Sequence, residues 1–187
     1  TWVHKANGMW DGWTKSIACD IDDILYTPTF GSIYRSLDHG ENWELMQQTT
    51  GAYERHVTQC GYDSIILIGG ESDQAMLRSV DKGVTWKSVL DFSSHNYDEY
   101  LTDICFGPEN TIYACSAITW FGGPHKAAVY HSFDFGNSWS VLLDSLDNIY
   151  YYSLAFDNTG RLLVGSTHGM LRYDVNSNSW DHIACEK

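Results

Sequence analysis

An eight-residue pattern, S-x-D-x-G-x-x-W, occurs three times in this chain without gaps. The three copies span residues 36–43, 79–86 and 132–139. A fourth segment, 173–180, keeps the Trp and loses the rest of the pattern, and Thr1-Trp2 matches the end of a fifth. The five Trp residues are separated by 41, 43, 53 and 41 residues. Self-similarity at a period of roughly 20 to 50 residues indicates a repeat architecture, in which each repeat is one supersecondary unit.

Each residue type in the pattern suits a tight turn between two β-strands. The Asp side chain can accept hydrogen bonds from backbone N–H groups of the turn that follows it. The Gly permits a positive φ, and the Trp ring can pack over the turn as the next strand begins. We therefore expect the Asp, Gly and Trp of the three copies to be structural and not catalytic. These residues are Asp38, Gly40, Trp43, Asp81, Gly83, Trp86, Asp134, Gly136 and Trp139.

Four short apolar segments occur in each repeat, and no segment has convincing helical periodicity. The high aromatic content, 14% of residues, also favours strands over helices. Four short strands in about 40 to 45 residues are typical of one β-propeller blade. We predict an all-β fold and a single β-propeller domain of about four four-stranded blades. The predicted blades span residues 16–47, 57–92, 101–144 and 152–187, and residues 1–6 form an extra outer strand.

The three repeated segments resemble the Asp-box, or BNR, repeats of sialidases, xyloglucan-hydrolysing enzymes, sortilin-type receptors and photosystem assembly factors. The last predicted blade, over residues 157–174, is also similar to propeller repeats of bacterial sensor ectodomains. The resemblance covers nearly the whole chain and implies the propeller fold. It does not select a function, because one scaffold hosts many activities. Most Asp-box proteins are exported, so the resemblance implies an extracellular or secreted protein.

The number of blades leaves three arrangements open. The last predicted blade already has its own outer strand, so the extra strand at residues 1–6 has no obvious place in a closed ring. The chain is a part of a larger propeller, an arc that closes with a second copy, or a small four-bladed ring. We favour a larger parent chain or a homo-oligomer, because an open arc leaves unpaired edges and bare faces. The sequence starts at Thr1 without Met, and we expect a processed or trimmed chain.

Composition excludes several classes of partner. The formal net charge of −13 would repel a polyanion, so we expect no nucleic-acid partner. No apolar run approaches the length of a membrane span, so we expect no membrane insertion. The eight His residues are scattered, the Cys residues form no zinc-type spacing, and we expect no metal and no cofactor.

Five cysteines are present, an odd number that argues against a complete disulfide framework. Cys19, Cys60 and Cys105 each fall in the first predicted strand of a repeat. We expect them to be small buried hydrophobic residues near the propeller axis.

Aromatic and acidic residues are concentrated in loops that a propeller places on one face, opposite the Asp boxes. Residues 117–126 form an insertion in one of these loops and account for the longest Trp spacing. Loops on a rigid scaffold commonly carry binding sites, and exposed aromatic rings beside polar groups suit glycans and peptides. The predicted ligand-binding residues are Trp13, Tyr53, His56, Tyr97, Glu99, Tyr100, Trp120, Phe121, His125 and Tyr150.

Three functions fit this surface. We favour a non-catalytic recognition module for a glycan or a protein. A glycoside hydrolase would need two carboxylates across a cleft, for which Glu54, Asp98, Glu99 and Asp147 are candidates. A structural or sensor ectodomain is the third possibility. The resemblance to sialidases implies an arginine cluster, but the arginines at 35, 78 and 172 precede the turn motifs at the opposite end, so a sialidase is disfavoured.

Overall fold

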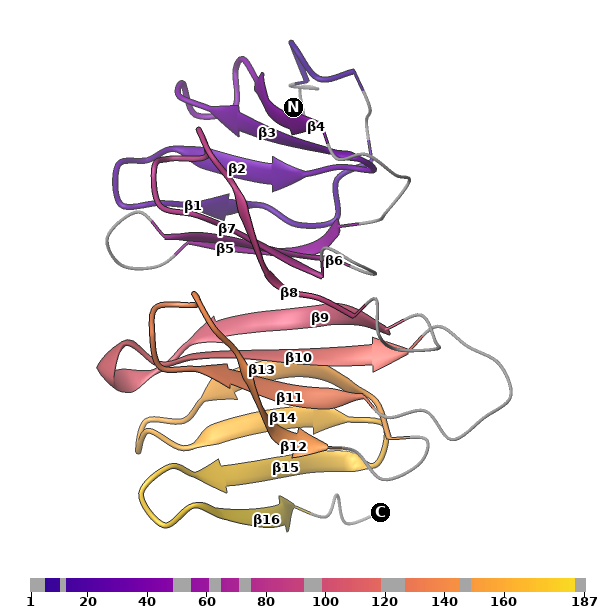
Figure 1. Cartoon of the computed structure of the whole chain (residues 1–187), viewed down its shortest axis with the longest axis vertical. Helices are drawn as coiled ribbons and strands as arrows, with labels where there is room; N and C mark the ends of the chain where they lie inside the picture. The colour runs from indigo at the N-terminus through magenta and orange to yellow at the C-terminus, as the bar shows by residue number, and fades with distance from the viewer. Residues whose placement is uncertain are drawn as a thin grey trace, which may run out of the picture.

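The computed structural model describes residues 6–10, 13–48, 55–60, 65–70, 75–92, 99–118, 127–144 and 149–183, with only the backbone described for 55–60. These residues form four four-stranded antiparallel sheets (Figure 1). Within the described ranges the regular structure is β, apart from one short 3₁₀ turn at Pro108–Asn110. The predicted all-β fold is therefore confirmed. No helix among these residues is long and apolar enough to cross a membrane.

Each sheet takes four strands that are consecutive in the chain, with neighbours in sequence paired side by side. The first blade contains β1 (Ala18–Cys19), β2 (Leu25–Pro28), β3 (Ser32–Ser36) and β4 (Glu44–Gln48). The second contains β5 (Arg55–Cys60), β6 (Ile66–Gly70), β7 (Met76–Ser79) and β8 (Lys87–Leu90). The third contains β9 (Glu99–Phe106), β10 (Ile112–Ile118), β11 (Ala128–Ser132) and β12 (Ser140–Asp144). The fourth contains β13 (Tyr151–Phe156), β14 (Leu162–Ser166), β15 (Gly169–Asp174) and β16 (Ser179–Ile183).

The four blades form an open arc. The first strand of each blade contacts the first strand of the next, from β1 to β5, β5 to β9 and β9 to β13. The first and last blades lie at opposite ends of the molecule (Figure 1). Of the three arrangements expected from the sequence, the small closed ring is therefore wrong, and the chain forms part of a propeller.

The core is divided into three clusters, one between each pair of neighbouring blades. Strand β6 shows why a single strand contributes to two of these clusters. Side chains alternate between the two faces of a strand, so Ile66 and Ile68 join the cluster with the first blade, while Leu67 joins the cluster with the third. All of these residues are at most 2% exposed because both faces of the sheet are covered. The uninterrupted apolar run 65–68 therefore belongs to a strand with a blade on each side.

The cysteines are only partly where we expected them. Cys115 is buried, and burial raises the pKa of its thiol to about 12. Cys105 is half-buried, but Cys19 is exposed, so the expectation of a buried Cys19 is wrong. In the strand pairing, Cys19 is equivalent to Phe156, whose ring contacts Tyr113 of the preceding blade. Cys19 lies on the first blade of the arc, where no described blade precedes it. The side chains of Cys60 and Cys185 lie outside the described part.

The segment before the first blade contacts the outer part of that blade. Asn7 forms an isolated parallel bridge with Asn42, and the Trp43 N–H donates to the Asn7 carbonyl at 2.8 Å. The next residue, Gly8, has φ +91°, and a Cβ there would collide with the Trp43 carbonyl oxygen. The extra outer strand predicted at residues 1–6 falls almost entirely outside the described residues.

Candidate functional site

The Asp-box turns satisfy their own polar groups. In the first blade, the Asp38 carboxylate accepts hydrogen bonds from the Asn42 backbone N–H at 2.8 Å and from the Ser36 hydroxyl at 2.9 Å. The same Ser36 hydroxyl accepts from the Gly40 N–H, and the Trp43 indole N–H donates to the Gly40 carbonyl. The second and third blades repeat these contacts. The chemistry of the motif is therefore used to close the turn.

These hydrogen bonds stabilise the charged form of each Asp-box carboxylate. The side-chain hydrogen bond from Asn42 is the largest cause that lowers the pKa of Asp38 from 3.8 to about 2. The Ser138 hydroxyl does most to lower the pKa of Asp134 to about 2, and the Thr85 hydroxyl has the largest lowering effect on the pKa of Asp81. A carboxylate with a depressed pKa contributes stability above its unfolded-state pKa, and this contribution disappears as the pH falls through its folded-state pKa.

We therefore expect the protein to lose stability as the pH falls from about 4 to about 2, because the Asp-box carboxylates become protonated in this window. Thermal unfolding followed by calorimetry across this range measures the loss. The double variant Asp38→Asn/Asp134→Asn cannot be protonated at these two sites, and its melting temperature should fall less steeply with pH. An identical slope in the variant and the parent protein would contradict this assignment.

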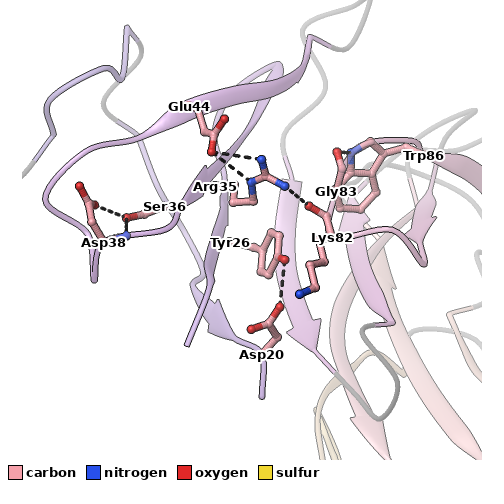
Figure 2. Close-up of polar contacts among 9 residues, drawn as sticks. All are labelled: Asp20, Tyr26, Arg35, Ser36, Asp38, Glu44, Lys82, Gly83 and Trp86. Atoms are coloured by element: carbon pink, nitrogen blue, oxygen red, sulfur yellow. Dashed lines mark hydrogen bonds and ion pairs between the residues drawn. The ribbon is translucent and has the colours of Figure 1, made fainter. Parts of the chain in front are cut away.

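A second set of contacts at the Asp-box end joins neighbouring blades. The residue between Asp and Gly has positive φ in each box: 57° at His39, 57° at Lys82 and 58° at Phe135. In the second and third boxes, the carbonyl of this residue accepts a hydrogen bond from an arginine of the preceding blade. The Arg35 guanidinium donates to the Lys82 carbonyl, and that of Arg78 donates to the Phe135 carbonyl, both at 2.7 Å. Figure 2 shows Arg35 between Glu44 of its own blade and Lys82 of the next. The Asp-box end is therefore a structural junction.

The opposite end, the loop face, carries the predicted binding residues. In the last blade the structure ties together the two loops that reach this face. The Thr167 N–H donates to the Tyr150 carbonyl at 3.0 Å, and the Thr167 hydroxyl accepts from the Tyr150 N–H at 3.2 Å. Exposed His168 follows, and its carbonyl lies 3.0 Å from Nε2 of His182 on β16. Tyr150 is half-buried, packed against the cluster between the third and fourth blades.

Sequence reasoning missed Thr167, which bonds the main chain of Tyr150, and the histidines beyond it, His168 and His182. The segment Ser166-Thr-His-Gly169 is the short turn between β14 and β15, and Gly169 has φ +108°. This polar turn between two apolar strands was the feature of the sequence that could have indicated these residues. The three residues add a hydroxyl and two imidazole groups to the end of the last blade that carries Tyr150, and such groups suit hydrogen bonding to a peptide or a sugar.

Glu99 is not in a loop, as the sequence had suggested, but is the first residue of β9. It is 1% exposed. Its carboxylate accepts hydrogen bonds from the hydroxyls of Ser116 at 2.5 Å and Tyr130 at 2.7 Å. Glu99 is therefore part of the blade interior, because the strand extends into the predicted loop and turns this side chain inward. Tyr100, the next residue, is half-buried.

Trp13 is 73% exposed and precedes the first blade. Trp13 leads into the first blade and Tyr150 into the last, so the structure does not bring these two predicted binding residues together. A cavity of about 300 Å³ lies beside this segment, lined by Met9, Thr14, Lys15, Ser16, Ile17, Thr27 and Trp43. The sequence pattern gave no sign of this cavity.

The remaining predicted binding residues lie outside the described part of the chain. This holds for Tyr53, Tyr97, Trp120, Phe121 and His125, and for the side chain of His56. Their role stays a prediction. Among the residues that are described, no three His, Cys, Asp or Glu side chains are grouped so that they could hold a metal ion.

Comparison with solved structures shows the same fold in proteins of diverse function. The extracellular domain of BT4673 from B. thetaiotaomicron, described as a hybrid two component system, matches with a TM-score of 0.72 and 13% identity over 92% of this chain and 22% of that one. The GH74 xyloglucanase from Xanthomonas campestris matches with a TM-score of 0.67 and 17% identity over 91% and 30% of the two chains. YCF48 from Cyanidioschyzon merolae matches with a TM-score of 0.60 and 19% identity over 93% and 56%.

At these identities the likeness shows the fold alone. The chain spans 22% to 64% of the length of these and the other similar structures. A search of curated protein sequences finds no significant match. The family model described as sortilin, neurotensin receptor 3, matches residues 31–184, which is most of the chain. The repeated Asp-box turns, the propeller blades and this match together place the chain in the Sortilin-Vps10 family.

Proposed function

We propose that this chain is part of an extracellular, receptor-like propeller that binds a peptide segment of another protein through its loop face, without catalysis. The observation that carries this proposal is the linked pair of loops at Tyr150 and Thr167. Hydrogen bonds hold an aromatic residue and the neighbouring His168 in one place on a rigid sheet end. Such preorganisation lowers the entropy that a binding surface loses when it meets its ligand.

Two comparisons support a peptide ligand over a glycan. The family model is named for sortilin, a neurotensin receptor. One of the similar solved structures is YCF48 bound to D1 peptide, with a TM-score of 0.62 and 15% identity. The net charge of −13 adds a preference for a segment that carries Lys and Arg, because complementary charge steers encounter and suppresses wrong partners.

The glycoside hydrolase alternative has less support. Of its four candidate carboxylates, Glu99 is buried and holds two hydroxyl groups of its own blade. The other three, Glu54, Asp98 and Asp147, lie outside the described residues. The likeness to the xyloglucanase is one of fold.

Binding of fluorescent peptide libraries, with basic and acidic members, tests the proposal by anisotropy, and a glycan array run in parallel tests the alternative ligand. We expect basic peptides to bind, and the Tyr150→Ala/His168→Ala variant to bind them about tenfold more weakly, because an aromatic anchor and a polar neighbour are lost. Phe133 is an equally suitable aromatic control, since it is 67% exposed at the Asp-box end. Phe133→Ala should bind as the parent protein does.

Three results would count against this proposal. Equal loss of affinity in the Phe133→Ala control would show that the peptide does not bind specifically at the loop face. Binding to glycans with no response to peptides would favour the glycan alternative. Release of reducing sugar from polysaccharides would favour the hydrolase. Circular dichroism of each variant separates a lost ligand contact from a lost fold.

A further inference from the structure

Two exposed histidines, His168 and His182, are linked to each other at the loop face of the last blade. His182 pairs with Leu171 across β15 and β16, and residues directly opposite each other point to the same face of a sheet. Leu171 packs against the cluster between the third and fourth blades. The imidazole of His182 therefore lies on the face toward the third blade and not on the face that ends the arc.

The two imidazoles belong to one blade and not to the repeat. Strand pairing makes Leu45, Ser88 and Val141 the equivalents of His182 on the other three outer strands. In the turn between the second and third strands, the residue of the first blade that corresponds to His168 is Gly31. A side chain that maintains the blade fold would be needed in the other blades too. These positions are therefore better explained by a role at the surface.

Hydrogen bonds indicate which nitrogen of His168 carries the proton. The Thr167 hydroxyl oxygen accepts from the Tyr150 N–H at 3.2 Å, so the hydroxyl hydrogen remains available to donate. Nδ1 of His168 lies 3.1 Å from this oxygen. An imidazole nitrogen that accepts a hydrogen bond has no proton, so the neutral ring carries its proton on Nε2. No described residue bonds Nε2, and His168 thus offers a free N–H donor.

The protonation of His182 follows from its contact with His168. Nε2 of His182 lies 3.0 Å from the His168 carbonyl oxygen, and a carbonyl oxygen can only accept. Nε2 is therefore the protonated nitrogen, and Nδ1 of the neutral ring keeps its lone pair. Within the described ranges Nδ1 has no partner. The two rings thus offer opposite functions, a donor on His168 and an acceptor on His182.

We propose that this histidine pair binds the main chain of one extended residue of the ligand. The Nε2–H of His168 donates to the carbonyl of that residue, and Nδ1 of His182 accepts from its N–H. An extended residue presents its N–H and C=O to the same side, as in a strand pair. This inference rests on the proposed function and adds what the site recognises, which is the peptide backbone. A sugar hydroxyl can donate or accept and does not require this pair.

A peptide and a peptoid test this assignment by fluorescence anisotropy. The peptide alternates Lys and Ala, and the peptoid carries the same side chains on its nitrogens, so it keeps the carbonyls and has no N–H in the main chain. His168→Phe should weaken both probes about fivefold, the effect of one hydrogen bond. His182→Phe should weaken the peptide about fivefold and leave the peptoid unchanged.

His39→Phe is the matched control. His39 is exposed at the Asp-box end, and Phe135 occupies the same position of the third box with nearly the same positive φ. The substitution is therefore compatible with the backbone, and this variant should bind both probes as the parent protein does. Circular dichroism shows whether each variant is folded.

Nitrogen-15 spectra of the histidine-labelled protein measure the protonation of both rings without a ligand. At about pH 8, above the usual titration range of imidazole, we expect the proton on Nε2 of His168 and of His182. A proton on Nδ1 of either neutral ring would overturn the inference. Equal affinity of the parent protein and His182→Phe for the peptide would also overturn it and leave the proposed function intact. If no basic peptide binds the parent protein, the proposed function fails and the inference fails with it.

Discussion

Replacement of Leu67 by alanine is expected to lower the free energy of unfolding by about 3 kcal/mol, a typical cost for a buried leucine. Leu67 is 0% exposed in the cluster between the second and third blades. It lies against the next Asp box, where a Cβ added to Gly136 would stand 3.2 Å from one Leu67 methyl group. The shortened side chain would leave a cavity in a rigid junction of two sheets, where neighbouring atoms have little room to collapse.

Urea unfolding followed by Trp fluorescence measures this loss, because Trp139 packs against the same cluster. The matched control is Leu45→Ala. Leu45 is 48% exposed on β4, and its replacement should cost less than about 0.5 kcal/mol. A loss below about 1 kcal/mol for Leu67→Ala would contradict the tight packing of the second blade on the third.

Replacement of Glu99 by alanine is also expected to lower the free energy of unfolding, by about 3 kcal/mol. The change removes the acceptor of the buried Ser116 and Tyr130 hydroxyls and also leaves a cavity. Glu99→Gln keeps the size of the side chain and one carbonyl acceptor, so it should cost less than the alanine variant. The exposed Glu44 is the matched control. Its ion pair with Arg35 lies at the surface, and Glu44→Ala should cost at most about 1 kcal/mol.

Thermal and urea unfolding of the three variants give these values, and peptide binding gives an independent measurement. Glu99 is buried within its own blade and does not reach the surface. The Glu99→Gln variant should therefore bind peptides with the affinity of the parent protein. A Glu99→Gln variant of normal stability that had lost binding, or had lost a hydrolytic activity, would instead assign this carboxylate a direct role at the loop face.

Local chemistry made the repeats readable from the sequence. The hydrogen bonds of each Asp box all lie within eight residues, and the alternation of apolar residues within a strand is equally local. The structure places Asp38, Gly40 and Trp43 in a self-contained turn, as the residue types indicate. The family match and the all-β fold agree with this prediction. The function was harder to predict from the sequence. The aromatic loops differ from one repeat to the next, so no repeated sequence pattern indicates which of their residues contact each other.

The strands, the turns and the propeller family could be predicted from the sequence, because they depend on interactions between residues close together in the chain. The open arc, the exposed Cys19 and the buried Glu99 became visible in the folded chain. It also revealed that Arg35 and Arg78 join blades, since each reaches a carbonyl 47 or 57 residues away. Burial at a blade face depends on whether another blade covers that face. The same strand sequence therefore lies in the core when a blade packs on it and at the surface when none does.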